Sequence, residues 1–285
     1  MPSLPSTIAL VAGASRGVGR GIARALGEAG ATVYVTGRTL KSARRRDAPG
    51  SIDETASDVT AAGGRGIAVQ ADHTRVEDVR ALIDGIRQRE GRLDVLVNAV
   101  WGGNEVGIAV QPFWEQPLAL WDATMRAGVW AAQLTTRFAS PLLIRTAERG
   151  GQPLVVTVSF DDGERYTGHL AYDLAKAALN RLAFGMSEDL RPHGVASVAL
   201  SPGFVRTERV LSAFGTSERR WKSKPELKQS ESPLYAGRAV VALAADPNVM
   251  DRSGLTLHAG SLARTYGFTD VDGRQPSRFV LPDPD

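Results

Sequence analysis

Short apolar runs alternate along the chain with longer segments in which apolar residues recur every three or four positions. The apolar runs are typical of buried strands, and they fall at residues 8–11, 31–35, 67–71, 93–97, 154–158, 195–200 and 255–258. The segments between them have helical spacing, most clearly at residues 75–89, 118–149, 171–190 and 233–245. Strands that alternate with helices along a whole chain predict an α/β fold built on a parallel sheet.

Local signals refine this outline. Ser51, followed three residues later by Glu54, predicts a capped helix start, and Pro141 predicts a break or bend in the segment 118–149 because proline lacks a backbone N–H. Residues 208–232 are polar and rich in Arg and Lys, which predicts a mobile flap with some helix. Because neither a repeat nor a linker is visible, we expect one domain over residues 1–285, with a core at about 5–262 and a tail at 263–285.

Composition narrows the function classes. The 285 residues are 43% hydrophobic, which suffices for a full core, and the net charge of only +3 argues against nucleic acid. A basic cluster at 44–46 keeps nucleic-acid binding open as a weaker alternative.

The absence of cysteine excludes disulfides and thiol nucleophiles. The four histidines are widely separated and do not predict a metal site, and no apolar run reaches the ~20 residues of a membrane helix. We expect a cytoplasmic protein.

A glycine-rich turn follows the first predicted strand. Gly13, Gly17 and Gly19 separate that strand from a predicted helix, and Ser15, Arg16 and Val18 lie among them. Glycines allow a tight turn and a close approach to a ligand, while the first N–H groups of a helix favour phosphate. The order strand, glycine turn, helix therefore predicts a dinucleotide site.

The residue after the second predicted strand bears on the choice of cofactor. In nucleotide-binding α/β units an acidic residue at this point selects a free ribose 2′-OH, whereas an arginine suits a 2′-phosphate. Here the residue is Arg38, and Arg16 is a second cation that could reach the same phosphate. We therefore expect NADP(H) rather than NAD(H). Asp72 follows the third strand, where it could accept from an adenine amino group or cap a helix.

The stretch from Ser159 to Lys176 contains groups suited to proton transfer. Tyr172 and Lys176 are four residues apart on a predicted helix, so their side chains share one face. A nearby ammonium favours the phenolate and is expected to lower the pKa of the Tyr172 hydroxyl. Ser159, at the end of the fifth strand, is a candidate to hydrogen-bond a substrate oxygen. Trp101, Phe113 and Trp114 either wall a substrate pocket or pack a loop.

These elements together resemble the short-chain dehydrogenase/reductase family over about residues 5–262. The matching elements are Gly13-Ala14-Ser15-Arg16-Gly17-Val18-Gly19, Asp72, Asn98-Ala99, Ser159, Tyr172-x-x-x-Lys176, and Pro202-Gly203 with Thr207. The tail around Leu262–Gly267 and Asp270–Gly273 is similar to a carbonyl-reductase-like branch of the family.

The resemblance implies a doubly wound (Rossmann) sheet of seven parallel strands with helices on both faces, and a homodimer or homotetramer. It implies hydride transfer between a nicotinamide and a carbonyl or alcohol. Tyr172 would be the general acid or base, Lys176 would lower its pKa and bind the ribose, and Ser159 would polarise the carbonyl. The cofactor would contact the glycine turn and further positions along the chain: Arg38, Asp72, Asn98, Ala99, Tyr172, Lys176, Pro202, Gly203, Val205 and Thr207.

Two departures from the family pattern affect the expected mechanism. The family's Asn-Asn-Ala-Gly is replaced here by Asn98-Ala99-Val100-Trp101, and the family's catalytic Asn aligns with Gly128. The second departure leaves open how protons would reach Lys176. The leading hypothesis is an NADP(H)-dependent carbonyl reductase or alcohol dehydrogenase, and the alternative is a cofactor-binding sensor or scaffold with weak or no turnover.

Overall fold

The computed structural model describes residues 2–43, 49–106, 111–161, 163 and 165–281. Within these residues seven strands form one sheet in the order β3-β2-β1-β4-β5-β6-β7. The strands are β1 (Ile8–Ala12), β2 (Thr32–Gly37), β3 (Arg65–Gln70), β4 (Val95–Asn98), β5 (Leu154–Val158), β6 (Ala196–Ser201) and β7 (Thr256–His258). The predicted doubly wound α/β fold with a seven-stranded parallel sheet is confirmed. The basic cluster at 44–46 lies outside the described residues.

The described chain divides into two compact units. Unit 1 comprises residues 2–71, 202–247 and 258–279, and unit 2 comprises residues 72–201, 248–257 and 280–281. Unit 1 contains the predicted cofactor turn, and unit 2 contains the predicted catalytic residues.

Unit 1 begins with β1, whose residues are all buried, as expected for a strand covered on both faces. β1 pairs in parallel with β2, and β2 pairs in parallel with β3. The helices of this unit are α1 (Gly17–Glu28), α2 (Ile52–Ala61), α8 (Glu208–Ala213), α9 (Pro233–Ala244) and α10 (Ala259–Tyr266). The predicted start of α2 is confirmed, because Ser51 is its N-cap and its hydroxyl accepts a hydrogen bond from the Glu54 N–H at 3.2 Å.

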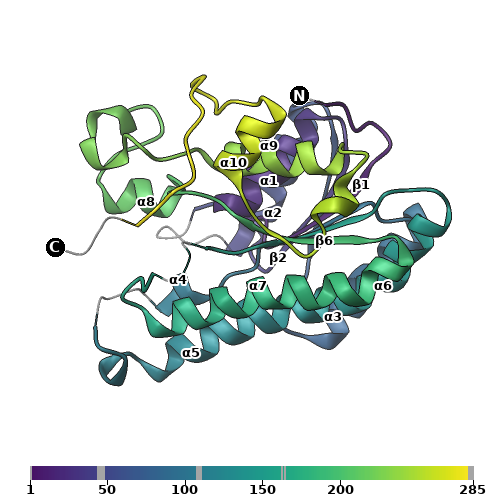
Figure 1. Cartoon of the computed structure of the whole chain (residues 1–285), viewed down its shortest axis with the longest axis horizontal. Coiled ribbons are helices and arrows are strands. Elements are labelled where there is room, and N and C mark those ends of the chain that lie inside the picture. The colour runs from purple at the N-terminus through teal and green to yellow at the C-terminus, as the bar shows by residue number, and fades with distance from the viewer. Residues whose placement is uncertain (1, 44–48, 107–110, 162, 164, 282–285) are drawn as a thin grey trace. The chain divides into compact units, whose positions relative to one another are not determined.

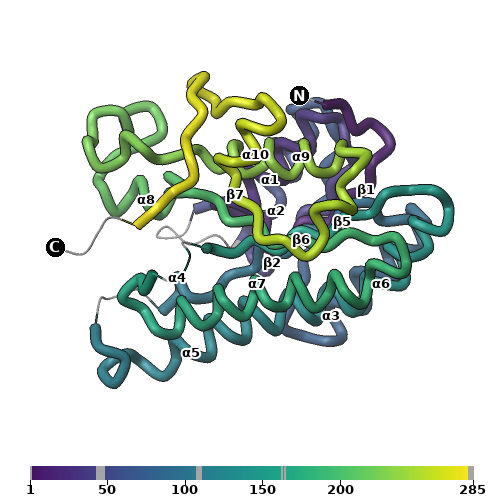
Figure 2. The backbone as a smooth tube through the Cα atoms, in the orientation of Figure 1, coloured from purple at the N-terminus to yellow at the C-terminus, as the bar shows by residue number. Residues whose placement is uncertain are grey.

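Glycines allow α1 and α9 to pack closely (Figure 2). A Cβ built on Gly21 of α1 would lie 2.3 Å from the Pro233 carbonyl, and one on Gly237 of α9 would lie 2.6 Å from the Ala25 Cβ. These distances are shorter than van der Waals contact. Any larger side chain at either position would push the two helices apart.

The segment predicted as a mobile flap contains α8 and two short 3-10 helices, η5 (Trp221–Ser223) and η6 (Pro225–Leu227). Leu211, Trp221 and Leu227 form a small buried cluster in this segment. The segment therefore has an apolar core of its own.

A buried ion pair connects this segment to the C-terminal part of unit 1. Arg206 and Asp270 have fully buried side chains, with 3.3 Å between Nη1 and Oδ2. The Arg206 guanidinium also contacts Glu218 at 3.0 Å and lies 4.3 Å from the centroid of the Trp221 ring. Asp270 also accepts a hydrogen bond from the Ser232 N–H at 2.8 Å. The predicted tail thus contributes the second half of α10 and a buried carboxylate to unit 1.

Unit 2 contains the three parallel strands β4, β5 and β6. Its helices are α3 (Val76–Glu90), α4 (Gly103–Val106), α5 (Leu118–Thr124), α6 (Ala131–Glu148) and α7 (Leu170–Leu190), with short 3-10 helices η2 (Phe113–Glu115), η4 (Arg191–His193) and η7 (Val249–Arg252). Figure 1 shows α6 and α7 side by side, and α7 packs on β5 and β6. This packing fixes the position of α7, which carries Tyr172 and Lys176.

The helical region 118–149 is interrupted at a different place from the one predicted. Pro141 lies inside α6, so the predicted break there is wrong. Instead a π-helical segment, η3 (Met125–Trp130), joins α5 to α6, and Ala127 within it has non-helical dihedral angles. Buried Leu142 and Leu143 anchor α6 beside the proline. Within the described part of the chain, every helix is too short or too polar to cross a membrane.

Candidate active site

The glycine turn in unit 1 has the geometry of a phosphate-binding loop. Gly13 and Gly17 have positive φ angles of 83° and 58°, which residues with a Cβ rarely adopt. A Cβ on Gly19 would lie only 2.3 Å from the Gly13 carbonyl oxygen, so glycine alone fits there. α1 begins at Gly17, and its first N–H groups are therefore directed at the turn.

A carboxylate lies at the start of α1. The Gly17 N–H donates a hydrogen bond of 2.9 Å to Glu208 Oε2. Thr207, the preceding residue, caps α8 by accepting from the Val210 N–H at 3.4 Å. The Thr207 methyl is 3.6 Å from the position of a Cβ on Gly17. The structure therefore brings the predicted Thr207 beside the glycine turn, together with an anion that the sequence did not predict.

The other predicted residues after β6 surround a buried carboxyl group. Val205 forms an isolated parallel bridge with Glu231, and a Cβ on Gly203 would lie 2.8 Å from Glu231 Oε2. Burial is the main reason that the pKa of Glu231 is raised to about 8. Pro202, which directly precedes Gly203, is buried.

Arg16 directs its guanidinium toward the end of β2. Its Nη2 donates a 3.2 Å hydrogen bond to Thr39 Oγ1, while its buried Nε has no protein partner. Arg38 is exposed one residue before Thr39, and its backbone carbonyl accepts from the Gln70 amide at 3.0 Å. The Arg16 guanidinium therefore lies near the end of β2, where Arg38 follows the strand, and a 2′-phosphate contact for the two arginines stays a prediction.

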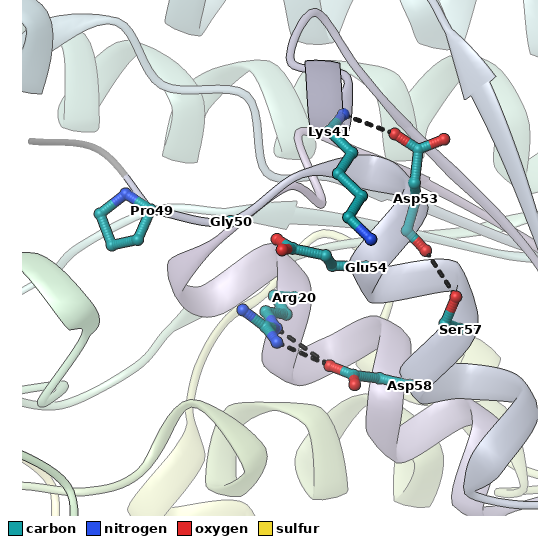
Figure 3. A pocket seen from close by; sticks show the side chains of 8 residues that line it. All are labelled: Arg20, Lys41, Pro49, Gly50, Asp53, Glu54, Ser57 and Asp58. Carbon is teal, nitrogen blue, oxygen red and sulfur yellow. Dashed lines mark hydrogen bonds and ion pairs between the residues drawn. The ribbon is translucent and has the colours of Figure 1, made fainter. Parts of the chain in front are cut away.

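A cavity of about 580 Å³ lies between α1 and α2 (Figure 3). It is lined by Arg20, Lys41, Pro49, Gly50, Asp53, Glu54, Ser57 and Asp58. Asp58 is bonded to Arg20 at 2.8 Å, and Asp53 accepts from the Lys41 backbone N–H at 2.7 Å. Three carboxylates accompany two cations here, so this cavity suits a phosphate poorly.

The residues of unit 1 fit a dinucleotide. The first N–H groups of α1 face the glycine turn, and Arg16 has a buried donor without a protein partner. Each feature is suited to a phosphate group. Within the described residues, no cluster of three or more His, Asp or Glu side chains could hold a metal ion.

Asp72, at the start of unit 2, accepts hydrogen bonds of the kind that stabilise the start of a helix. Its Oδ1 accepts from the Thr74 N–H at 2.9 Å and from the Thr74 hydroxyl at 2.8 Å. The neighbouring His73 is buried and bonded to Thr135 at 2.8 Å, and burial lowers its pKa to about 4. The histidine is therefore a neutral structural residue. An adenine contact for Asp72 stays a prediction.

Unit 2 brings Ser159, Tyr172 and Lys176 together. The Ser159 hydroxyl donates to the Lys176 backbone carbonyl at 3.0 Å, and Lys176 Nζ lies 5.5 Å from the centroid of the Tyr172 ring. The Asn180 side chain, one turn further along α7, donates to the Phe160 carbonyl at 3.1 Å. This bond ties the chain after β5 to α7.

The pKa values of the pair differ from the expectation. Burial, followed by the Asp173 charge, raises the pKa of the Tyr172 hydroxyl above its usual 10.0, so the predicted lowering by Lys176 is wrong. Burial also lowers the pKa of the Lys176 amine from 10.5 to about 7. The loss of hydration outweighs the attraction between the two groups. Near neutral pH, Tyr172 is a phenol and Lys176 exchanges its proton readily.

The Trp101 ring contacts both Lys176 and Tyr172. Lys176 Nζ lies 4.0 Å from the centroid of the indole ring, and the Tyr172 ring meets Trp101 edge-on at 5.5 Å. Phe160 lies 6.0 Å from Tyr172 on a tilted plane. Of the three aromatic residues considered as pocket walls, Trp101 therefore lies beside Tyr172 and Lys176, whereas Phe113 and Trp114 are exposed and contact each other.

Gly128 lies next to the same indole. It is buried within η3, and a Cβ added to it would be 3.2 Å from both Cε3 and Cζ3 of Trp101. Asn98, at the end of β4, donates to the Thr136 hydroxyl at 2.9 Å, and its buried Oδ1 has no protein partner. Ala99 follows Asn98 and is half-buried.

Two contacts at the candidate site were missed at the level of sequence. One is the indole of Trp101 over Lys176, and the other is the carboxylate of Glu208 at Gly17. A signal for the first was present, because both departures from the family pattern, Trp101 and Gly128, form one contact. The second had no sequence signal, since the two residues are 191 positions apart.

Comparisons with known proteins agree with this geometry. The family described as short chain dehydrogenase matches residues 7–216. Dehydrogenase/reductase SDR family member 1 of Mus musculus is 38% identical over 275 residues, which cover 94% of this chain and 84% of the mouse protein. The Homo sapiens protein of the same name is 36% identical over 283 residues, covering 96% of this chain and 86% of the human protein.

A solved structure supports the fold. A short chain dehydrogenase from Mycobacterium thermoresistibile superposes with a TM-score of 0.80 at 23% identity, covering 99% of this chain and 95% of that one. The resemblance of this chain to SDR family member 1 is confirmed by the two relatives of that name, whereas a carbonyl reductase activity stays a prediction. The chain belongs to the short-chain dehydrogenase family.

Proposed function

We propose that this protein is an NADP(H)-dependent oxidoreductase that reduces a carbonyl compound or oxidises the corresponding alcohol, with Tyr172 as the general acid or base. Short-chain dehydrogenases use NAD(H) or NADP(H) and act on small molecules. The observation that carries the proposal is the placement of Tyr172 and Lys176 on one face of α7, with Lys176 Nζ 5.5 Å from the phenol ring.

The protonation state of Tyr172 is compatible with the reductive reaction. Reduction of a carbonyl requires a proton donor for the substrate oxygen, and the Tyr172 hydroxyl is protonated at neutral pH. Lys176, with a pKa of about 7, is suited to return a proton to Tyr172 after each turnover. The bound nicotinamide would supply or accept the hydride.

Ser159 would hold the substrate oxygen. A hydroxyl has a single proton to donate, and in this structure that proton is directed to the Lys176 carbonyl. The substrate oxygen must therefore draw the hydroxyl away by rotation about the Cβ–Oγ bond. After this rotation, the hydrogen bond from the Ser159 hydroxyl to the substrate oxygen would polarise the substrate carbonyl.

The phosphates of the cofactor would be held by unit 1. The glycine turn and the N–H groups of α1 would bind its phosphates, and Arg16 and Arg38 would bind the 2′-phosphate that distinguishes NADP(H). Asn98, Ala99, Pro202, Gly203 and Val205 are further proposed contacts. We also propose a cytoplasmic location and a homo-oligomer.

A second candidate function is cofactor binding with weak or no turnover. It is favoured by Gly128, which offers no side chain for the proton path that the family's Asn provides. The two functions differ in whether NADPH is consumed.

The test is to incubate the protein with NADPH and a panel of aldehydes and ketones, and to follow the absorbance of NADPH. We expect oxidation with at least one carbonyl, and a fall of ~10²–10⁴ in kcat for Tyr172→Phe, which removes the proton donor. Tyr166→Phe is the control, because Tyr166 is exposed by 60% and loses the same oxygen. Full activity in Tyr172→Phe would refute the assignment, and NADPH binding without oxidation would favour the second candidate.

A further inference from the structure

Lys176 has an unusual partner for a buried amine. Within the described residues its ammonium lies over two aromatic rings, at 4.0 Å from Trp101 and 5.5 Å from Tyr172. A cation over the face of an indole is attracted by the ring's quadrupole, and the attraction is strongest where water is excluded. Burial lowers the pKa of Lys176, so the contact lies where this attraction is largest.

The position of the indole depends on residue 128. A Cβ there would approach Cε3 and Cζ3 of Trp101 to 3.2 Å, which is tighter than ordinary van der Waals contact. A longer side chain would extend further into the space that the ring occupies. The absence of a side chain at Gly128 and the indole of Trp101 are therefore two parts of one arrangement.

We infer that Trp101 is the positioning residue of Lys176, holding its ammonium beside Tyr172 in the space that Gly128 leaves open. The catalytic meaning of this contact rests on the proposed function. The contact itself lies wholly within unit 2 and can be tested without substrate or cofactor. It joins both departures from the family pattern in one arrangement, because the ring of Trp101 lies where a side chain at position 128 would reach.

The primary test is a double-mutant cycle on stability with Trp101→Met, Lys176→Met and the double variant, each unfolded in urea at pH 6. At this pH the Lys176 amine, with a pKa of about 7, is mostly protonated. We expect the two substitutions to be coupled by about 30-fold in the unfolding equilibrium constant, the size of a desolvated cation–π contact. Additivity within about twofold would overturn the inference.

Trp130 provides the matched control. It lies at the end of η3 and donates its indole N–H to the Thr74 carbonyl at 3.2 Å. The cycle of Trp130→Met with Lys176→Met should be additive. Equal coupling in the two cycles would mean a general response of the unit to a lost tryptophan, and would also overturn the inference.

Two further variants separate the ring face from simple packing. Trp101→Phe keeps an aromatic face, so a phenylalanine at position 101 should retain at least about a third of the coupling free energy that the tryptophan has with Lys176, both measured against methionine. If apolar volume alone mattered, phenylalanine and methionine would be equivalent. Gly128→Ala should stabilise the Trp101→Met protein, since alanine favours helix, but should not stabilise the wild type, where the indole blocks the new methyl. The same effect in both backgrounds would contradict the pairing.

A kinetic arm tests the catalytic meaning. Trp101→Met should lower kcat by about tenfold, a part of the ~10²–10⁴ that positioned proton transfer contributes, while Trp101→Phe should stay within threefold of wild type. A wild type that oxidises no NADPH would refute the proposed function and leave the stability cycle to decide the contact. An additive cycle in an active enzyme would refute only the role of Trp101.

Discussion

The backbone N–H of Gly17 donates a hydrogen bond to the carboxylate of Glu208, with 2.9 Å between N and Oε2. Arg20 supports the same carboxylate, with 3.8 Å between Nη1 and Oε1. An anion at the first N–H of a helix is stabilised by the helix dipole. Glu208 therefore holds a donor that a cofactor phosphate would need.

This contact predicts that Glu208→Gln tightens NADPH binding. The neutral amide competes less well for the Gly17 N–H, and we expect Kd to fall about threefold, in line with the ~0.3–1 kcal/mol of a charge near a helix N-terminus. Titration of NADPH fluorescence measures the change. Glu226→Gln, at an exposed glutamate in η6, is the control and should leave Kd unchanged. Weaker binding in Glu208→Gln would mean that the carboxylate assists the cofactor.

Arg38→Asp should reverse the preference between the two dinucleotides. A carboxylate repels the 2′-phosphate and accepts from a free ribose hydroxyl. We expect Kd for NADPH to rise by about 10- to 100-fold, the value of a lost charged hydrogen bond, while Kd for NADH changes little. Arg89→Asp makes the same charge change at an exposed site of α3. Equal loss of both cofactors in Arg38→Asp would show that this residue does not read the 2′-phosphate.

The buried pair Arg206 and Asp270 predicts a large loss of stability in Asp270→Asn. The substitution leaves a buried guanidinium without its buried carboxylate, and we expect the free energy of unfolding to fall by about 3–5 kcal/mol. Urea unfolding provides the measurement. Asp84→Asn breaks the exposed Asp84–Arg87 pair and should cost about 0–1 kcal/mol.

Replacing both charges should recover stability. An apolar pair of similar size avoids the burial of ions, so the double variant Arg206→Met, Asp270→Leu should be more stable than Asp270→Asn. A double variant less stable than the single one would indicate that the remaining bonds of this cluster matter more than the ion pair.

Glu231 predicts a specific dependence of stability on pH. Its pKa is raised from 4.5 to about 8, chiefly by burial and also by the Asp270 charge, against the opposing effects of the Gly203 N–H and Arg206. Between these two pH values the folded state binds more protons than the unfolded state. The contribution of Glu231 to the free energy of unfolding therefore falls as pH rises from 4.5 to 8, by up to about 1.4 kcal/mol per pH unit.

Glu231→Gln should remove this contribution, because the amide resembles the protonated carboxyl group and does not titrate. The variant should be close to wild type at pH 5 and more stable than wild type at pH 8. Urea unfolding across this range makes the comparison. Parallel stability curves for the two proteins would show that Glu231 is ionised throughout.

Local patterns in the sequence determined most of the fold. Fully buried parallel strands are continuous apolar runs, so strands such as β5 were predicted with correct bounds. The Ser51 cap and the glycine turn are also read from neighbouring residues. The common face of Tyr172 and Lys176 follows from helical spacing alone.

Tertiary structure decided the features that depend on distant residues. The interruption of the helical region lies at η3 rather than at Pro141, and the buried Gly128 there meets Trp101, a ring from another part of the chain. Arg206 contacts Asp270, which is 64 positions away, and the Gly17 N–H donates to Glu208. No local pattern encodes such partners.

The pKa values of Tyr172 and Lys176 also depend partly on the sequence and partly on the tertiary structure. The sequence by itself determined that a phenol and an ammonium would be neighbours, and proximity alone predicted a lower pKa for Tyr172. Only the folded structure determines how much water each group loses, and burial is the largest cause of both shifts, raising the pKa of Tyr172 and lowering that of Lys176. Sequence spacing thus selected the two reacting groups, and the packing around them set their proton affinities.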